Sequence, residues 1–284
     1  MRFQSTVALA IACALGFATP AVAAPLVFTA TPNARNATLD ATYRLFAGFL
    51  AGAAMNPVRY ENAHSLFAYA SLMGQRKFDI VFDGPQFTAW RDAREGYRPI
   101  VRLRPPLVFE ILVGAGAQDA RIQVPRDLDG QTVCVPPFPN LATIVLDNHT
   151  SQVASPSIVV RPGPKQDLQA FLKGDCVATV VPKKLAMKTS PGVARVLYTS
   201  QAYPNLTVSV SPKVSRAVRQ RLRAALLSPR GEALAKRIFG QTFVPAHRAE
   251  YTPYAGMLNQ SFLFSALTGM STAAAPAPAA GGEQ

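Results

Sequence analysis

The chain has 284 residues, 49% of them hydrophobic, and its 29 basic and 16 acidic residues give a formal net charge of +13. This length can bury a sizeable core in two lobes, and the charge indicates either attraction to anions or a solvated basic surface. Nucleic acid is a poor candidate partner, because no Lys/Arg run is interleaved with aromatic residues and no zinc-ligand spacing occurs.

The first 23 residues have the pattern of a cleavable export signal. Arg2 precedes an uncharged apolar run from Thr6 to Phe17, and the small residues of Ala21-Val22-Ala23 suit a signal peptidase. The apolar run is shorter than the roughly 20 residues that span a bilayer, so cleavage is favoured over a membrane anchor. Lipid modification of Cys13 is a weaker alternative. We therefore expect an exported protein that begins near Ala24.

Strands and helices alternate after the signal. Leu26–Ala30 is a short apolar β-type run, and the loop 31–36 leads into an amphipathic helix. Further strands are predicted at Pro57–Tyr60 and Phe78–Phe82, separated by a helix at Ser65–Met73. The turn Asp83-Gly84-Pro85 follows the third strand. This alternation predicts a parallel sheet with right-handed crossovers.

A second α/β unit begins after the β-type run Leu107–Val113. Strands are predicted at Thr132–Pro136, Ser157–Arg161 and Cys176–Val181, with helices near 140–148 and 166–173 between them. Ligands of open α/β sheets lie beyond the carboxyl ends of the strands, so a cleft between the two units is the expected site.

The last third returns to helices. Ser215 can cap a helix that turns Leu222 and Leu226 inward, and a second helix opens at Pro229 and ends at Gly240. A stripe of arginines on the first helix is interpreted as a solvated face rather than a binding patch. Residues 267–284 are rich in Ala and Pro and are predicted to be a disordered tail.

Two cysteines, Cys134 and Cys176, remain after removal of the signal. An oxidising compartment allows them to pair. Each lies in an apolar strand-like run, however, where a free cysteine commonly acts as a small buried hydrophobe. We favour free, neighbouring cysteines, with a disulfide as the alternative.

At this point the chain resembles the phosphate/phosphonate-type solute-binding proteins of ABC importers, within the type 2 periplasmic binding-protein superfamily. The resemblance covers nearly the whole mature chain and is carried by the order of Phe78–Pro85, Pro105–Phe109, Asp127–Val133, Leu172–Ala178 and the closing helix pair Arg219–Ser228 and Gly231–Phe239. It implies an α/β fold of two Rossmann-like lobes joined by two hinge crossings, near Pro106–Phe109 and Tyr203–Val208. Lobe I would comprise 24–104 and 205–266, and lobe II 105–204.

The resemblance also implies a set of ligand-binding positions at the carboxyl ends of strands and at the start of one helix. They are Thr31, Asn33, Asn62, His64, Asp83, Gly84, Pro85, Gln86, Phe138, Asn140 and Thr143. Free N–H groups and the dipole at a helix start favour an anion without a charged side chain. Phe138, in a proline-rich loop, adds an apolar wall. Asp83 would repel an ionised oxyanion unless it is protonated, pairs with a cation or points elsewhere.

These expectations describe a periplasmic, non-catalytic solute-binding protein. It would capture a small oxyanion such as phosphate or phosphonate and deliver it to an ABC transporter permease, as a monomer and without a cofactor. No two of His64, His149 and His247 lie at helical metal spacing, so neither a metal site nor a catalytic site is predicted. The alternative is an accessory protein of the cell envelope that keeps the fold, has lost the pocket and binds through its basic surface.

Overall fold

The computed structural model describes residues 24–32, 36–116, 119–151, 153–161, 163–189 and 191–259. The predicted export signal, Cys13, Asn33 and the predicted tail lie outside the described residues. Within them, no helix combines the length and apolar character needed to cross a bilayer.

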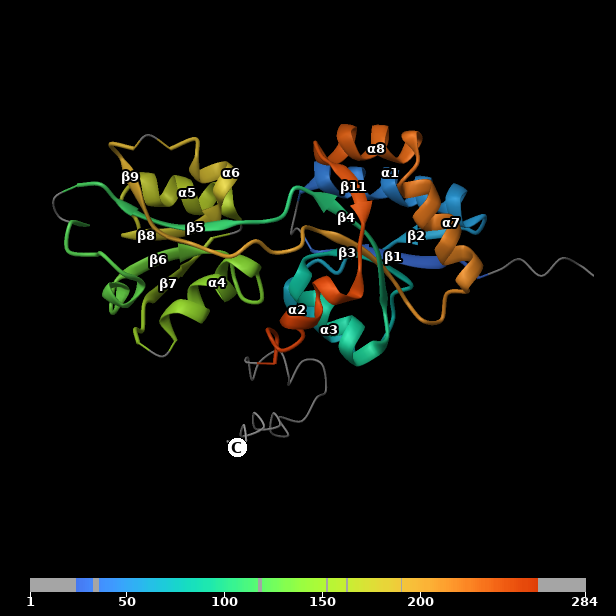
Figure 1. Ribbon diagram of the computed structural model, residues 1–284, viewed down its shortest axis with the longest axis horizontal. Coiled ribbons are helices and arrows are strands. Elements are labelled where there is room, and N and C mark those ends of the chain that lie inside the picture. Colours follow the sequence, from blue (N-terminus) through green and yellow to red (C-terminus); the bar gives the residue numbers. More distant parts are fainter. Residues whose placement is uncertain are drawn as a thin grey trace, which may run out of the picture.

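The chain forms two α/β lobes, each built around one sheet (Figure 1). The larger sheet, in lobe I, has the order β11-β4-β10-β3-β1-β2. Its strands are β1 (Leu26–Ala30), β2 (Val58–Tyr60), β3 (Ile80–Asp83), β4 (Arg98–Arg104), β10 (Thr207–Val210) and β11 (Thr242–Pro245). Its helices are α1 (Ala37–Ala54), α2 (Leu66–Gly74), α3 (Pro85–Glu95), α7 (Arg216–Leu226) and α8 (Pro229–Phe239).

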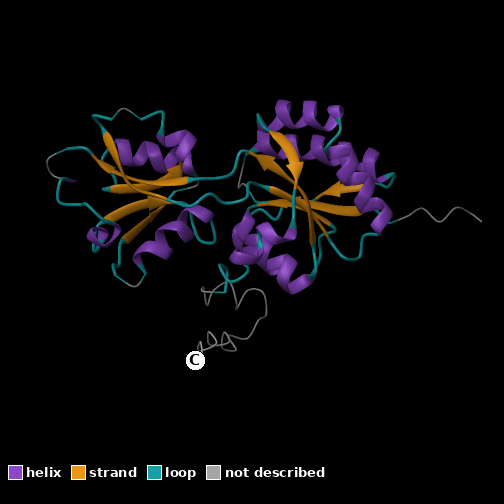
Figure 2. Cartoon of the chain, viewed as in Figure 1, coloured by secondary structure: helices purple, strands orange, loops and turns teal. Residues whose placement is uncertain are grey.

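The smaller sheet, in lobe II, has the order β7-β6-β8-β5-β9. Its strands are β5 (Phe109–Gly114), β6 (Thr132–Val135), β7 (Ser157–Val160), β8 (Ala178–Pro182) and β9 (Ala194–Thr199). Its helices are α4 (Leu141–Thr150), α5 (Pro164–Leu172) and α6 (Lys183–Ala186), with a 3-10 turn η2 (Pro125–Leu128) before β6. Helices cover both faces of each sheet (Figure 2), as the predicted α/β class requires.

Both sheets are mixed, which corrects the prediction of a parallel sheet. The predicted β1, β2 and β3 are parallel, as are β6, β7 and β8, but β10 runs antiparallel to β3 and β4, and β5 runs antiparallel to β8 and β9. The parallel strands end at the side that faces the other lobe. Because β5 and β10 each follow a crossing from the other lobe, they enter at that side and must run in the opposite direction.

The two crossings lie against each other between the lobes (Figure 1). Leu107 and Tyr203 exchange two backbone hydrogen bonds of 2.8 Å. The side chain of Asn205 fixes the base of the crossings, because its Nδ2 donates to the carbonyl of Pro105 at 2.6 Å and to Oε1 of Gln241 at 2.9 Å. We retain the lobe limits of 24–104 with 205–266, and 105–204, as a proposal.

Cys134 and Cys176 form a disulfide, with 5.7 Å between their Cα atoms. The preference for free cysteines was therefore wrong, although their proximity was predicted. Cys134 lies on β6 and Cys176 just before the adjacent β8, and both are buried against Ala170 of α5. Sequence patterning correctly indicated burial, but it carries no signal that distinguishes two adjacent buried thiols from a bonded pair.

Candidate functional site

Four helices begin where parallel strands end, on the side of each lobe that faces the other. α1, α2 and α3 follow β1, β2 and β3 in lobe I, and α4 follows β6 in lobe II. Three of them have a side-chain cap: Asn36 accepts from the N–H of Leu39 at 3.0 Å, Ser65 from Ala68 at 3.1 Å, and Asn140 from Ala142 at 3.0 Å. α3 has no such cap and begins at Gly84-Pro85. The positive ends of these helix dipoles are therefore gathered at one region.

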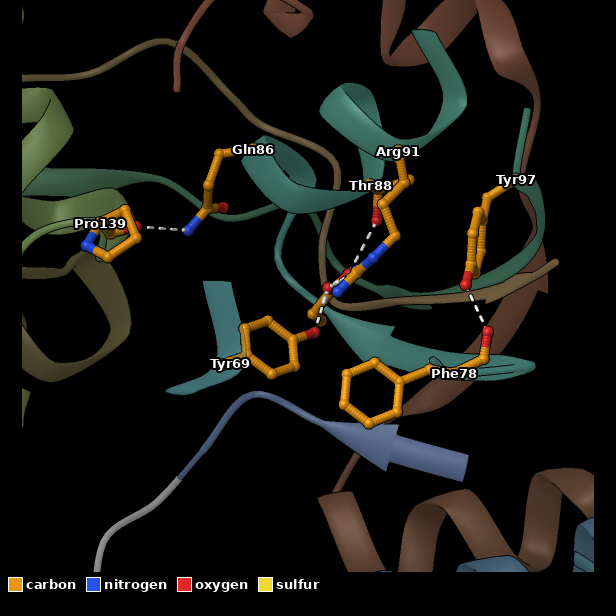
Figure 3. Close-up of polar contacts among 8 residues, drawn as sticks. Tyr69, Phe78, Gln86, Thr88, Arg91, Tyr97 and Pro139 are labelled. Carbon is orange, nitrogen blue, oxygen red and sulfur yellow. Dashed lines mark hydrogen bonds and ion pairs between the residues drawn. The ribbon is translucent and has the colours of Figure 1, made fainter. Parts of the chain in front are cut away.

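The start of α3 touches the loop before α4 across the lobes. Nε2 of Gln86 donates to the carbonyl oxygen of Pro139 at 3.0 Å (Figure 3). Gln86 is 3% exposed, and its Oε1 is buried without a partner among the described residues. Phe138 and Ile144 of lobe II pack against the aromatic cluster of lobe I that includes Trp90. Polar and apolar contacts thus join the two lobes beside the helix starts.

Asp83 is the last residue of β3, directly before the Gly84-Pro85 turn, and belongs to a buried network. Its partners Tyr69, Thr88 and Arg91 are labelled in Figure 3. Its carboxylate pairs with the guanidinium of Arg91, and it accepts hydrogen bonds from the hydroxyls of Tyr69 at 2.5 Å and Thr88 at 3.2 Å. The Asp83 and Arg91 side chains are both 0% exposed. The carbon at the centre of the Arg91 guanidinium lies 5.1 Å from the ring centre of Tyr69 and 5.7 Å from that of Tyr97.

The network is neutral as a whole. Burial raises the pKa of the Tyr69 hydroxyl well above its ordinary value, so this hydroxyl stays a donor to Asp83. Burial, the largest single effect, would lower the pKa of Arg91, but the negative charge of Asp83 together with Tyr69 and Tyr97 raises it, so the guanidinium stays charged. Asp83 is therefore paired with a cation and wholly buried. The pairing of Asp83 with Arg91 removes the repulsion that this predicted site residue would exert on an anion.

The other predicted positions lie around the same helix starts. Thr31 and Asn62 are half-buried and His64 is exposed. Thr31 follows β1, and its N–H donates to the carbonyl of Phe82 on β3 at 3.2 Å. Asn62 accepts from the backbone N–H of His64 at 2.9 Å, and His64 has a φ of 59°. The hydroxyl of Thr143 donates to the carbonyl of Pro136, so its proton already has an acceptor.

Sequence reasoning missed the helix α3 and with it Arg91, the cation that neutralises Asp83. Two signals were available: Gly84-Pro85 is a common helix start, and Gly96, with a φ of 73°, ends the helix in the left-handed conformation. Such a helix places Arg91 two turns after the turn residues, in reach of the strand end. Among the described residues there is no group of three His, Cys, Asp or Glu that could hold a metal ion.

Comparison with protein families matches residues 28–251 to the model described as the phosphonate periplasmic substrate-binding protein of ABC transporters. The match covers both lobes and both crossings. A comparison with curated protein sequences gives no match.

Solved structures share the fold at low sequence identity. The protein XAC2383 of Xanthomonas citri, bound to ATP, is 14% identical with a TM-score of 0.66, over 84% of this chain and 98% of that one. PhnD1 of Prochlorococcus marinus, in complex with methylphosphonate, is 12% identical with a TM-score of 0.63, over 83% and 97%. A binding protein component of a Pseudomonas aeruginosa ABC phosphonate transporter is 11% identical with a TM-score of 0.58, over 83% and 86%.

Proposed function

The chain belongs to the family of periplasmic substrate-binding proteins of phosphonate ABC transporters, and from this membership we propose that it captures a small oxyanion, such as phosphate or phosphonate, between its lobes. Members of this family are transport proteins of the periplasm. We further propose that the chain is exported by its first 23 residues, works as a monomer and delivers its ligand to an ABC permease. No catalytic role is part of this proposal.

The observation that supports this proposal best is the approach of two helix starts with no uncompensated negative charge beside them. The hydrogen bond of Gln86 to Pro139 brings α3 of lobe I next to the loop that opens α4 of lobe II. Backbone N–H groups in the first turn of a helix have no partner within the helix and attract anions. The pairing of Asp83 with Arg91 removes the one carboxylate at the β3 end that would oppose an anion.

The proposed ligand contacts combine neutral donors with an apolar wall. They are Thr31, Asn62, His64, Gly84, Pro85, Gln86, Phe138, Asn140 and Thr143, together with Asn33, on the strength of the family resemblance. The segments 62–64, 84–86 and 136–143 contain no Lys or Arg, so attraction would come from helix dipoles and neutral donors. The unpaired Oε1 of Gln86 is an acceptor that a hydroxyl of a partly protonated oxyanion could satisfy. Phe138 suits the apolar substituent of an organophosphonate.

A second candidate function is the accessory envelope protein without a pocket. Its support is the apolar contact between the lobes, in which Ile144 of α4 is 2% exposed and packs with Phe138 into the aromatic cluster of lobe I. A protein held together by such packing would bind partners through its surface and have no need of a ligand in the cleft.

Thermal unfolding and calorimetry with methylphosphonate, phosphate, sulfate and amino acids distinguish the two functions. A cleft ligand raises the unfolding midpoint by mass action. The variant Asn140→Asp keeps a good helix cap but puts a negative charge at the start of α4, and we expect it to weaken binding of an oxyanion at least about tenfold.

Ser215→Asp is the matched control, because it makes the same kind of change at the cap of α7, which follows β10 at the end that points away from lobe II. It should leave affinity within about twofold of the parent. The absence of any stabilising ligand would favour the accessory protein. A ligand whose affinity is unchanged by Asn140→Asp would have to bind outside the cleft.

A further inference from the structure

The excess positive charge of the chain is concentrated on one part of lobe I. Residues 216–239, which form α7 and α8, contain seven Lys or Arg and one Glu, whereas lobe II, residues 105–204, contains nine basic and seven acidic residues. α1, α7 and α8 pack on the sheet face that carries Phe28 and Phe82, and α2 and α3 pack on the opposite face. The face of lobe I that α7 and α8 cover is therefore far more basic than lobe II.

A groove between α1 and α8 lies on this basic face, with a volume of about 660 Å³. The two helices occur side by side in lobe I (Figure 1), and the ring centres of Phe46 and Phe239 are 5.6 Å apart between them. The groove is lined by three arginines, Arg44, Arg230 and Arg237, and by the apolar residues Leu45, Phe49 and Leu234. No acidic residue lines it.

Two of the three guanidinium groups carry uncompensated charge. Arg44 pairs with Asp40, four residues earlier, at 2.9 Å. Arg230 and Arg237 have no ion pair in the part of the chain that the structure describes. Glu232, the acidic residue of α8, forms its ion pair with Lys236 at 2.9 Å. Because Arg230 and Arg237 are seven residues apart, they lie on one face of α8. The groove therefore offers two guanidinium groups from one face of α8.

The apolar residues decide which anion fits. Leu45 is 47% exposed, and Phe49, which lines the same groove, is half-buried. A guanidinium fork matches phosphate oxygens, and basic residues beside exposed Leu or Phe are the combination that lies at the boundary of headgroups and acyl chains. An acidic peptide would neutralise the arginines but would leave Leu45 facing a polar chain.

We propose that this groove binds the phosphate headgroup of an anionic phospholipid and holds the basic face of lobe I against a membrane surface. The remaining arginines of α7 and α8 add attraction to the same surface. This site is separate from the cleft, so it does not depend on the ligand proposed there. Its effect would be to keep the exported protein beside the membrane, with its lobes free to bind solute.

Co-sedimentation with vesicles tests the proposal directly. The mature chain is mixed with vesicles of phosphatidylcholine, with and without phosphatidylglycerol, and we expect binding only when phosphatidylglycerol is present and a decline as salt rises. The double variant Arg230→Glu/Arg237→Glu should weaken this binding at least about thirtyfold, because each basic residue near a membrane contributes about a factor of five.

The matched control is Lys184→Glu/Lys188→Glu, which changes net charge equally on two exposed lysines of lobe II. It should bind vesicles within about threefold of the parent. Unfolding midpoints check that both double variants fold. If Arg230→Glu/Arg237→Glu does not fold, Arg230→Gln/Arg237→Gln is used in its place. Leu45→Gln should also weaken binding, because it removes the apolar contact without changing charge.

Three results would overturn the proposal: no binding to phosphatidylglycerol vesicles, equal losses in the lobe I and lobe II variants, or tighter binding to an acidic peptide than to vesicles. Equal losses would mean that net charge alone drives attraction. Calorimetry with the cleft ligand should be unchanged in Arg230→Glu/Arg237→Glu, so this test and the test of the cleft can fail independently.

Discussion

The turn after β3 in lobe I and the loop after β6 in lobe II meet between the lobes, but they are supported by different chemistry. Each follows an inner strand of its sheet and opens a helix, α3 or α4. The lobe I turn sits on the buried ion pair of Asp83 and Arg91. The lobe II loop is rich in proline, carries Phe138 and lies after the strand that holds the Cys134–Cys176 disulfide.

This difference indicates a division of roles. Lobe I holds its turn with hydrogen bonds and a charge pair, which fixes the electrostatic environment of the site. Lobe II holds its loop with restricted backbone and a covalent cross-link, which fixes shape. Both supports are local to one lobe, so movement between the lobes is left to the crossings at Leu107 and Tyr203 and to the polar and apolar contacts that Gln86 and Phe138 make between the lobes.

The largest effect is expected from breaking the charge pair of lobe I. Arg91→Met leaves the fully buried Asp83 without its cation and should cost about 3–5 kcal/mol of unfolding free energy, measured by urea unfolding. Arg94→Met, an exposed position on the same helix, is the control and should change stability by less than about 0.5 kcal/mol.

A double variant sharpens this prediction. Asp83→Asn/Arg91→Met removes both charges together and should be more stable than the sum of the single losses implies, because no unpaired charge is left buried. If the unfolding free energy of the double variant falls by the full sum of the two single losses, then packing, rather than charge, supports the turn.

The next largest effect should follow removal of the covalent support in lobe II. The disulfide joins residues 42 apart in sequence, and a loop of that length corresponds to about 2–4 kcal/mol. Cys134→Ala/Cys176→Ala should lower the unfolding midpoint in urea accordingly, and the parent should do the same after reduction.

Thiol titration of the denatured, unreduced chain checks the bond itself and should find no free thiol in the mature protein. Equal stability of the parent and Cys134→Ala/Cys176→Ala would show that the lobe II loop needs no covalent support.

The sequence predicted the α/β fold, the two lobes and the order of the parallel strands, because these depend on local apolar patterns. Leu26–Ala30 was predicted with the bounds it has, and Ser157–Arg161 ends one residue beyond β7. The mixed character of the sheets could not be read in this way. Strand direction in β5 and β10 follows from where the crossings re-enter each sheet, and no residue in these strands encodes it.

The sequence predicted where the candidate site lies, but it did not predict that the charge of Asp83 is neutralised. Family resemblance indicated the turn at Gly84 and the helix start at Asn140, and the structure brings their neighbours Gln86 and Pro139 into contact. The state of Asp83 required knowledge of Arg91, eight residues later on an unpredicted helix. The hydroxyl of Thr143, which stays among the proposed ligand positions, donates to the carbonyl of Pro136, a short-range contact that composition does not reveal.

A smaller effect, on the pH dependence of stability, concerns a buried acidic residue of lobe II that is not paired with a cation as Asp83 is with Arg91. Asp167 on α5 is 0% exposed, and neither carboxyl oxygen has a hydrogen-bond partner among the described residues. Burial raises its pKa to about 7, against a smaller opposing effect of Arg161. Because the folded state then holds a proton that the unfolded chain releases, stability should fall between about pH 4 and pH 7.

Asp167→Asn should remove this fall and gain on the order of 2–4 kcal/mol above about pH 7, with little gain near pH 4. Urea unfolding across this pH range measures it. Asp147→Asn, at an exposed position of α4, is the control and should run parallel to the parent. A pH profile unchanged by Asp167→Asn would show that the carboxyl is solvated or paired.

The smallest effect should come from the single hydrogen bond that joins the two contrasted regions. Gln86→Met keeps the length of the side chain but removes the donor to Pro139, at a cost of about 1 kcal/mol to the arrangement in which the lobes touch. Solution scattering of the ligand-free protein should then show a larger radius of gyration, since fewer molecules keep the lobes together. Gln75→Met, at an exposed position after α2, should leave the radius unchanged.

Ligand affinity distinguishes two roles for Gln86. If it only joins the lobes, affinity should fall about fivefold or less, the population shift that 1 kcal/mol allows. If its amide also contacts the ligand, the loss should exceed about tenfold, because a hydrogen bond to a charged group contributes more. An unchanged radius together with an unchanged affinity would mean that the hydrogen bond between α3 and the α4 loop is incidental. The lobes would then be held together by apolar packing, that of Phe138 and Ile144 in lobe I and that of Tyr254 and Met257 on lobe II.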